Sequence, residues 1–448
     1  MLRTDTTAVA VIVVAVLLAY FNALGAAFQF DDFNVIVDNP AVHSVGGWVA
    51  SMPGIRPLLK LSYALNWSLQ PAPFGFHLFN VAVHALNAVL VYHLLRKLVS
   101  VNGQGSWAPL VGALLFALHP VQTEAVTYVS GRSVSLMASF YLASLLAGLR
   151  AREGAAVQWS MFSAALFGLA LLVKESAITL PLALLLIDWY RDRGEAGARA
   201  RVLRLRWHFL VVAFAIGVML ASPTYRHMLD VSLSVRGILD NLLTQANAVC
   251  YLAMQLVLPW RMNVDPDLPV ATGMSVGLLL ECALLVGVIL FALRRLRARA
   301  WLAFAILWFV MLLLPTNSFV PRLDVANDRQ LYLAFIGVFF WAGLGVDWLR
   351  RPNHVRLAAG VATAVLLVLA IATVQHNAIY GSAVAFWEDT LEKSPGKARV
   401  ANNLGFAYQQ AGRYAEAKLA YQQAIDADPG YWKARINLEA LDSQSGPR

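Results

Sequence analysis

Long apolar stretches recur through most of the chain, and they constrain its fold more than any other feature. Hydrophobic residues make up 59% and charged residues 14% of the 448 residues, whereas charged residues normally form about 25% of a soluble domain. A helix crosses the roughly 30 Å hydrocarbon core with about 20 apolar residues, so we expect an all-α membrane protein. Eleven stretches are apolar enough to be spans or, where short, to be completed by flanking residues: 7–28, 78–95, 108–118, 133–149, 157–173, 177–189, 209–221, 275–293, 300–314, 331–348 and 357–374.

The placement of arginine predicts the orientation of these spans. Arginines gather at 191–206, 294–299 and 350–356, with smaller basic pairs at 96–97 and 150–152. Cytoplasmic loops are enriched in Lys and Arg, so we expect these loops and the amino terminus to be cytoplasmic. The outward-facing parts are then the loops at 29–76, 119–132, 223–274 and 316–330, together with the carboxyl-terminal tail.

Two segments allow a second interpretation. Residues 241–259 are apolar enough to cross but carry Gln245, Asn247 and Gln255. A crossing there would place the arginines at 294–299 outside, so we expect a re-entrant or surface-lying helix and eleven spans, with twelve as the alternative. The first stretch could also be a cleaved signal peptide, because Arg3 precedes it and small residues follow it.

Charge and cysteine content argue against two other kinds of protein. The net charge of +9 would suggest a nucleic-acid partner in a soluble protein, but here topology accounts for it. The two cysteines, Cys250 and Cys282, both lie in apolar stretches. They form neither a disulfide framework nor a zinc site, so we interpret them as buried thiols.

The tail differs in composition from the rest of the chain. After residue 374 it is rich in charged and amide residues with alanine at helical spacing. The positions that match the tetratricopeptide pattern, at its register of about 34 residues, are Leu404-Gly405, Tyr408, Ala417, Tyr421, Ala424 and Pro429. We therefore divide the chain into a membrane domain at 1–376 and a repeat domain at 377–448, with one complete repeat at about 398–431. So short an array should lean on the membrane domain or on a partner, either docking a peptide or acting as a stabilising cap.

Two adjacent acids directly follow the first span. Asp31 and Asp32 are flanked by aromatic residues, and at such a boundary at least one carboxyl should have a raised pKa unless a cation compensates. This suits a general base or a metal ligand, although an ordinary acidic loop would look the same.

Further ionisable residues cluster at the outer ends of the predicted spans. Polar groups at membrane depth cost several kcal/mol unless they are paired or functional, so together they suggest a cavity that opens outward. Guanidinium groups clamp phosphate oxygens, and the cations that could converge on a phosphate are Arg56, Arg132, Lys174 and Arg329. The other candidates for the cavity are His77, His84, His119, Glu124, Glu175, Asp328 and Tyr332. His77 and His84 share a helical stripe with Asn80 and Asn87, which packing hydrogen bonds explain equally well.

In the order of its motifs the chain resembles the family C integral-membrane glycosyltransferases, and most of all the tetratricopeptide-containing branch similar to the protein O-mannosyltransferases. The motifs are Phe30-Asp31-Asp32, Asp38-Asn39-Pro40, Arg56-Pro57-Leu58, residues 76–80 with His84, residues 119–126 with 130–132, Lys174-Glu175, Asp328-Arg329 with Leu331-Tyr332, and the terminal repeat. The tail holds about one complete repeat, fewer than is common in that branch, which puts extended recognition of a protein substrate in doubt.

The resemblance implies a reaction. A polyprenyl-phosphate-linked sugar would move, with inversion, to an acceptor hydroxyl of a secreted or pilin-like protein or a glycan at the outer face. Asp31 resembles the first acid of the family's two-acid motif and is the preferred base, followed by Asp32. A divalent metal stays open as a cofactor, and the alanine- and arginine-rich composition favours a bacterial inner membrane with the repeat in the periplasm.

Two other functional classes make different predictions. A transporter or flippase should carry polar residues at mid-membrane in broken helices and related halves, whereas here they gather at outer ends. A scaffold that only presents repeats would need neither many spans nor the acidic loop.

Overall fold

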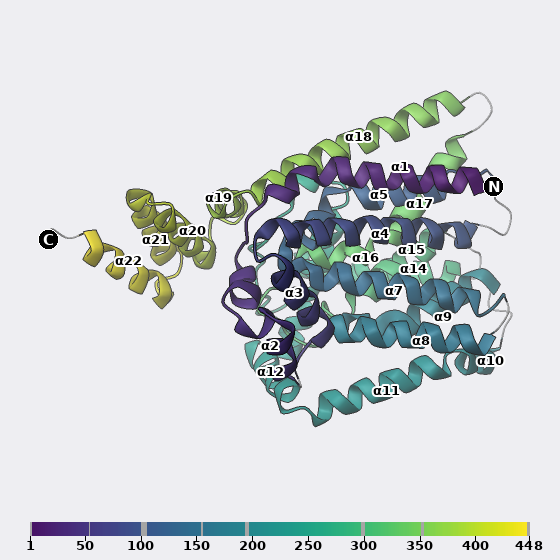
Figure 1. The fold of residues 1–448 in the computed structure, drawn as a ribbon, viewed down its shortest axis with the longest axis horizontal. Helices are drawn as coiled ribbons and strands as arrows, with labels where there is room; N and C mark the ends of the chain where they lie inside the picture. The colour runs from purple at the N-terminus through teal and green to yellow at the C-terminus, as the bar shows by residue number, and fades with distance from the viewer. Residues whose placement is uncertain are drawn as a thin grey trace.

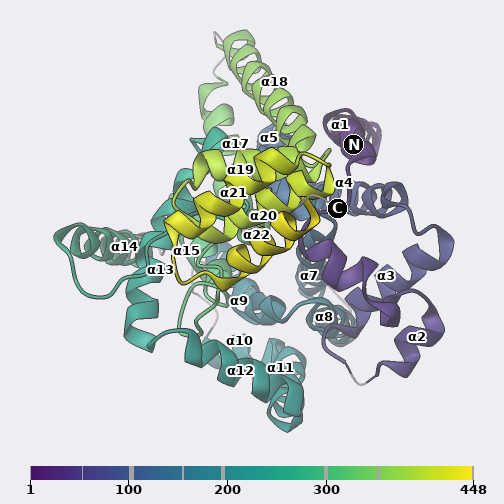
Figure 2. The ribbon, with the colours of Figure 1, turned by 90° about the vertical axis from the view of Figure 1, so that its left-hand side faces the viewer.

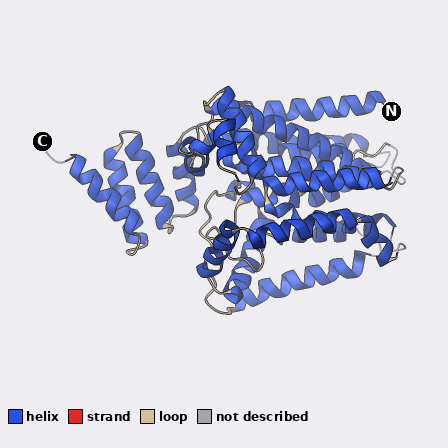
Figure 3. Cartoon of the chain, turned by 60° about the horizontal axis from the view of Figure 1, so that its bottom comes forward, coloured by secondary structure: helices blue, strands red, loops and turns tan. Residues whose placement is uncertain are grey.

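A computed structural model describes residues 2–52, 54–99, 105–153, 156–192, 197–296, 301–350 and 354–445. Within these ranges the regular structure is entirely helical (Figure 3). Parts of the arginine clusters, including Arg193, Arg297, Arg299 and Arg351, lie outside the described residues.

Most of the chain forms one bundle of roughly aligned helices (Figure 1). Its longer helices are α1 (Leu2–Tyr20), α4 (Pro73–Val99), α5 (Ala108–Leu118), α7 (Arg132–Arg150), α8 (Ala156–Val173), α9 (Leu180–Asp192), α11 (Arg206–Ala221), α14 (Val276–Arg295), α15 (Trp301–Leu313), α17 (Ile336–Leu349) and α18 (Val355–Ile379). Helix α4 packs against α1, α5 and α7, and the packing continues through α8 to α11 on one side and through α17 to α15 on the other. The largest hydrophobic core lies between these helices.

The prediction of an all-helical structure with apolar helices long enough to span a membrane is confirmed, but the predicted count of eleven spans is not. In the described parts of the chain, six helices are long and apolar enough to cross a membrane, and eight if each of two bent pairs counts as one span. The bent pairs are α11 with α12 (Pro223–Val235), at 81°, and residues 328–334 with α17, at 56°. Helices α5 and α15 are apolar but have only 11 and 13 residues, because irregular segments replace their outer ends.

Further helices and loops cover the end of the bundle that faces the repeat. They include α2 (Val45–Ala50), α3 (Pro57–Leu69), α6 (Thr123–Val126), α13 (Ile238–Met254) and α16 (Leu331–Ala334). Both ends of α13 are fixed there: before it, Arg236 donates to the carbonyl of Arg322 (2.8 Å), and after it, the amide of Asn263 donates to Asp328 (3.1 Å). The segment at 236–263 that contains α13 therefore begins and ends on the same side of the bundle.

The repeat domain extends from the end of α18 and sits over this face of the bundle (Figures 1 and 2). It comprises α19 (Ala383–Lys393), α20 (Ala398–Gln410), α21 (Tyr414–Ala427) and α22 (Trp432–Ser445). Ser382 caps α19 by accepting from the amide of Ala385 (3.1 Å). Gly405 lets α20 approach α21, because a Cβ there would lie 2.6 Å from the ring of Tyr421.

A glycine also allows a close backbone contact where α7 meets the outer loops. Gly131 precedes α7, and a Cβ at this position would lie 2.0 Å from the backbone oxygen of Glu124. Backbone cannot swing away as a flexible side chain can, so residues 124 and 131 approach this closely only because residue 131 lacks a side chain.

Gly131→Ala should lower the midpoint of thermal unfolding of the purified protein in detergent, because overpacking typically costs about 1–3 kcal/mol or more. Gly168→Ala is the matched control, since a Cβ on that residue of α8 meets nothing within 4 Å. An unchanged midpoint in Gly131→Ala would contradict the close approach.

Candidate active site

The segment between α5 and α7 breaks into short turns, and side chains of α4 form hydrogen bonds with it and with the adjoining helices. The side-chain amide of Asn80 donates to the carbonyl of Val126 (3.0 Å) in this segment, and that of Asn87 donates to the carbonyl of Ser135 (2.7 Å) in the first turn of α7. His84 bonds through Nε2 to the carbonyl of Ala117 (3.1 Å). Broken backbone in a membrane needs such partners, so the polar stripe of α4 stabilises the fold.

The three predicted cavity histidines are all buried in the bundle. His84 contacts the Tyr332 hydroxyl through Nδ1 (2.8 Å), and His119 accepts from the amide of Val121 through Nδ1 (3.2 Å). His77 is fully buried, and neither ring nitrogen has a hydrogen-bond partner of good geometry among the described residues. The structure thus places His77, His84, His119 and Tyr332 in packing positions beneath the outer loops.

Asp32 ties the outer loop to the broken segment. One carboxylate oxygen accepts from the amide of Gln29 (2.9 Å), and the other accepts from the amide (2.7 Å) and the hydroxyl of Ser130. Burial raises the pKa of Asp32 to about 7 although these hydrogen bonds favour the charged form. A carboxylate with this many internal partners is suited to positioning.

Asp31 is oriented differently from its neighbour. It is partly exposed, and its backbone amide donates to the hydroxyl of Tyr128 (2.9 Å). The preceding residue, Phe30, has a φ of 42°, a left-handed conformation that is unfavourable for a bulky side chain. Such strain persists only where the surroundings enforce it, and here it points adjacent acids in different directions.

Glu124 and Arg329 form an ion pair beside Asp31. Glu124 Oε2 accepts from the backbone amide of Arg329 (2.8 Å), and Oε1 lies 3.5 Å from the Nε atom of Arg329. Burial raises the pKa of Glu124 although Arg329 opposes this effect. Asp328 is 4% exposed. One of its carboxylate oxygens accepts from the amide of Asn263, and the other has no hydrogen-bond partner among the described residues.

A cation group, made up of Arg56, Lys174, Arg322 and Arg329, lies next to Glu124. Arg56 binds Glu175 with two nitrogens, at 2.8 and 3.0 Å from Oε2. The side chain of Lys174 forms no hydrogen bond or ion pair with any described residue, and the charges of Arg56, Arg322 and Arg329 all act on it. Burial, followed by these like charges, lowers the pKa of Lys174 well below its usual value. Excess positive charge of this kind is suited to binding an anion.

Arg132 is the one predicted phosphate ligand that lies outside this group. It is fully buried, and its guanidinium donates to Asn80 (2.7 Å) and to the carbonyls of Ser62 (3.2 Å) and Phe76 (3.1 Å). Because protein groups already accept these hydrogen bonds, the structure gives Arg132 a role in holding α3, α4 and α7 together.

The repeat domain completes the wall of the site. Arg399 donates to both carboxylate oxygens of Asp265 (2.8 and 2.6 Å) and to Asp324 (2.7 Å), joining two outer loops. Trp387 meets the ring of Phe30 edge-on, with centroids 5.2 Å apart. The enclosed cavity measures about 10 Å³ and is lined by Phe30, Asp31, Glu124, Tyr128, Val264, Asp265, Asp324, Asn327, Arg329, Trp387 and Arg399. That is about one water molecule's worth of space, so the site is closed in this conformation.

Sequence reasoning missed Arg322, Asp324, Asp265 and Arg399. Each is a charged residue in a predicted outer loop or in the repeat, which was the available signal, but only the fold shows which of them meet. Among the described residues, no group of three or more His, Cys, Asp or Glu side chains is placed to hold a metal ion.

Comparison with known proteins gives matches to both parts of the chain. A tetratricopeptide repeat model matches residues 398–431. The protein O-mannosyl-transferase Tmtc3 of Drosophila melanogaster is 25% identical over 95% of this chain and 56% of its own length. The protein O-mannosyl-transferase F38B6.6 of Caenorhabditis elegans is 24% identical over 93% of this chain and 62% of its own.

A shorter region is more similar. The protein O-mannosyl-transferase Tmtc2 of Drosophila melanogaster is 35% identical over 38% of this chain and 20% of its own length. The chain spans no more than 62% of the length of these three relatives. The chain is thus similar over more than nine tenths of its length to two proteins named protein O-mannosyl-transferases, and it carries a tetratricopeptide repeat, as the motifs predicted.

Proposed function

We propose that the protein is a glycosyltransferase that moves a sugar from a polyprenyl-phosphate donor to a hydroxyl group of a protein. The observation that carries this proposal is the placement of a partly exposed acid, Asp31, beside a group of cations at one end of a membrane bundle. The names of the relatives support mannose as the sugar and protein as the acceptor. The tetratricopeptide repeat over the site supports a protein acceptor as well.

The proposed reaction is a single displacement. Asp31 takes the proton of the acceptor hydroxyl while the oxygen attacks the anomeric carbon of the sugar. The bond between that carbon and the phosphate oxygen breaks on the opposite side, and polyprenyl phosphate leaves with the bonding electrons. Attack opposite to the leaving group inverts the anomeric configuration.

The cation group would hold the donor phosphate. Lys174 and Arg322 are the most available members, because Arg56 is bound to Glu175 and Arg329 to Glu124. Fixed positive charge stabilises the negative charge that develops on a leaving phosphate. This assignment moves the phosphate contact from Arg132 to Arg322 and retains Arg56, Lys174 and Arg329.

The proposed topology follows from the ends of the helices. Arg96 and Lys97 close α4 and Arg150 closes α7, at the opposite end of these helices from Asp31 and the repeat. The positive-inside rule then places the amino terminus in the cytoplasm and the site outside. In a bacterial inner membrane the repeat would be periplasmic.

Asp31→Asn should reduce the rate of transfer about 10²–10⁴-fold, because the variant removes the general base. Its unfolding midpoint should stay near that of the wild type, since no described group bonds to the Asp31 carboxylate. Asp32→Asn is the matched variant. Both oxygens of Asp32 accept from N–H donors, so the NH₂ group of Asn would face one of these donors and leave it buried and unpaired. We expect this substitution to lower the stability by about 1–3 kcal/mol. Near-normal transfer by folded Asp31→Asn would exclude Asp31 as the base and make Glu124 the next acid to test.

Lys174→Gln should raise the KM for the polyprenyl-phosphate donor roughly 10- to 100-fold, the effect expected for loss of a charge-assisted hydrogen bond. Lys60→Gln removes the same charge from α3 at the same end of the bundle and should leave this KM unchanged. Equal effects of the two substitutions would indicate general electrostatic attraction and would contradict a phosphate site at Lys174.

The repeat should affect the chemistry as well as acceptor docking, because Arg399 shares a cavity with Asp31. Arg399→Gln should lower kcat with a short peptide acceptor and with a whole protein alike, by about 10- to 100-fold if the wall shifts by about 1 Å. Arg413→Gln is the control, since Arg413 pairs with Glu416 on the exposed repeat surface. A loss confined to the whole-protein acceptor in Arg399→Gln would limit the repeat to docking.

A further inference from the structure

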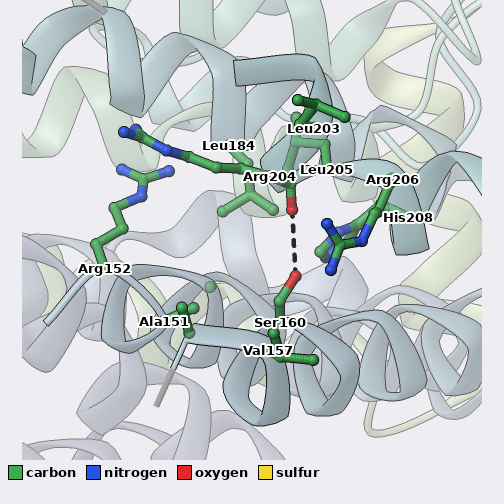
Figure 4. Close-up of a pocket in the computed structure, with 12 residues that line it drawn as sticks. Ala151, Arg152, Val157, Ser160, Leu184, Leu203, Arg204, Leu205, Arg206 and His208 are labelled. Atoms are coloured by element: carbon green, nitrogen blue, oxygen red, sulfur yellow. Dashed lines mark hydrogen bonds between the residues drawn. The ribbon is translucent and has the colours of Figure 1, made fainter. Parts of the chain in front are cut away.

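A second basic site lies at the end of the bundle opposite the repeat. The ends of α7, α8 and α9 and the junction of α10 (Ala198–Arg204) with α11 enclose a cavity of about 420 Å³ (Figure 4). Arg152, Arg204 and Arg206 line it, and the guanidinium groups of Arg152 and Arg204 point toward one another (Figure 4).

Two of the three arginines around this cavity have no counter-charge among the described residues. Arg152 pairs with the buried carboxylate of Asp188. Arg204 and Arg206 are exposed and form no ion pair with any described residue, and none of the described residues that line the cavity is Asp or Glu. Neighbouring like charges repel one another, so an anion beside Arg204 and Arg206 would stabilise this end of the bundle.

Two polar groups make the cavity more than a surface cluster of arginines. Ser160 donates to the carbonyl of Arg204 (3.1 Å) and thereby fixes the α10–α11 junction to α8. His208 is 1% exposed, bonds to Ser163 through Nε2 (2.9 Å), and leaves Nδ1 without a hydrogen-bond partner in the described structure. A buried polar atom in a cavity wall calls for a ligand or solvent.

An apolar hollow accompanies the basic cavity along the same two helices. It measures about 320 Å³ and is formed by Met161, Ala164 and Ala165 of α8 together with Trp207, Leu210, Val211 and Phe214 of α11. A free inorganic anion would use only the arginines, whereas a phospholipid would use both features. Basic cavities between membrane helices are known to bind acidic lipid head groups.

We propose that the cavity between α7, α8 and the α10–α11 junction binds the phosphate of an anionic phospholipid, whose acyl chains lie along the hollow between α8 and α11. Arg204 and Arg206 contact the phosphate, and Arg152 completes the positive rim. The site lies in the leaflet opposite the candidate active site, so this inference is independent of the proposed transferase function.

The test measures lipid binding to the purified full-length protein by native mass spectrometry and by the unfolding midpoint in detergent. Dioleoylphosphatidylglycerol should bind and raise the midpoint by roughly 2–5 °C. Dioleoylphosphatidylcholine, which has the same chains and no net charge, should do so far less, and inorganic phosphate should have no effect. The double substitution Arg204→Gln and Arg206→Gln should weaken binding of phosphatidylglycerol at least about tenfold, as expected from the loss of charge-assisted hydrogen bonds.

A matched control separates the cavity from general surface charge. Arg294→Gln with Arg295→Gln removes two charges from the end of α14 and should leave binding unchanged. Equal loss in both double variants, equal stabilisation by inorganic phosphate, or stronger binding of a polyprenyl phosphate than of phosphatidylglycerol would each overturn the proposal. Transfer activity is not used as the readout, so failure of the proposed function would leave this result interpretable.

Discussion

The hydrogen bonds of Asp32 are the interaction on which the rest of the candidate site depends. Its carboxylate joins Gln29, directly after the first span, to Ser130, directly before α7. This link fixes the outer loop over the broken segment between α5 and α7 and turns the neighbouring Asp31 toward Glu124, Tyr128 and the repeat. The burial of Asp32 therefore sets the exposure of Asp31, and two chemically identical neighbours acquire different roles.

The same end of the bundle brings together three separately anchored parts. Outer loops supply the acids, the cation group supplies positive charge, and helices α19 and α20 of the repeat domain close the cavity through Trp387 and Arg399. A cavity of about 10 Å³ admits neither a sugar nor an acceptor, so a working cycle requires this wall to move. Such a movement of the repeat would break the contacts of Arg399 with Asp265 and Asp324, together with those of Lys397 and Ser394 with the loop at 263–267.

Local patterns predicted the membrane helices and the tetratricopeptide repeat, because hydropathy and repeat spacing are properties of short segments. The number of spans was less accessible, since α5 and α15 end early in irregular turns. The importance of Asp31 and Asp32 could be expected from their position after a span, but not the difference between them. That difference depends on Ser130, which lies 98 residues away from Asp32 in the chain. Likewise, the sequence suggested that Arg132 could bind a phosphate, but in the fold its guanidinium donates to Asn80 and to two backbone carbonyls.

The most direct test of the account is a transfer assay with the purified protein, a polyprenyl-phosphate mannose donor of known anomeric configuration and a peptide rich in Ser and Thr. Mass spectrometry would detect the added hexose, and NMR of the product would give its configuration. The account predicts transfer to a hydroxyl-bearing side chain with inversion at the anomeric carbon. Retention of configuration, or an absence of transfer by folded protein with a matched donor and acceptor, would contradict it.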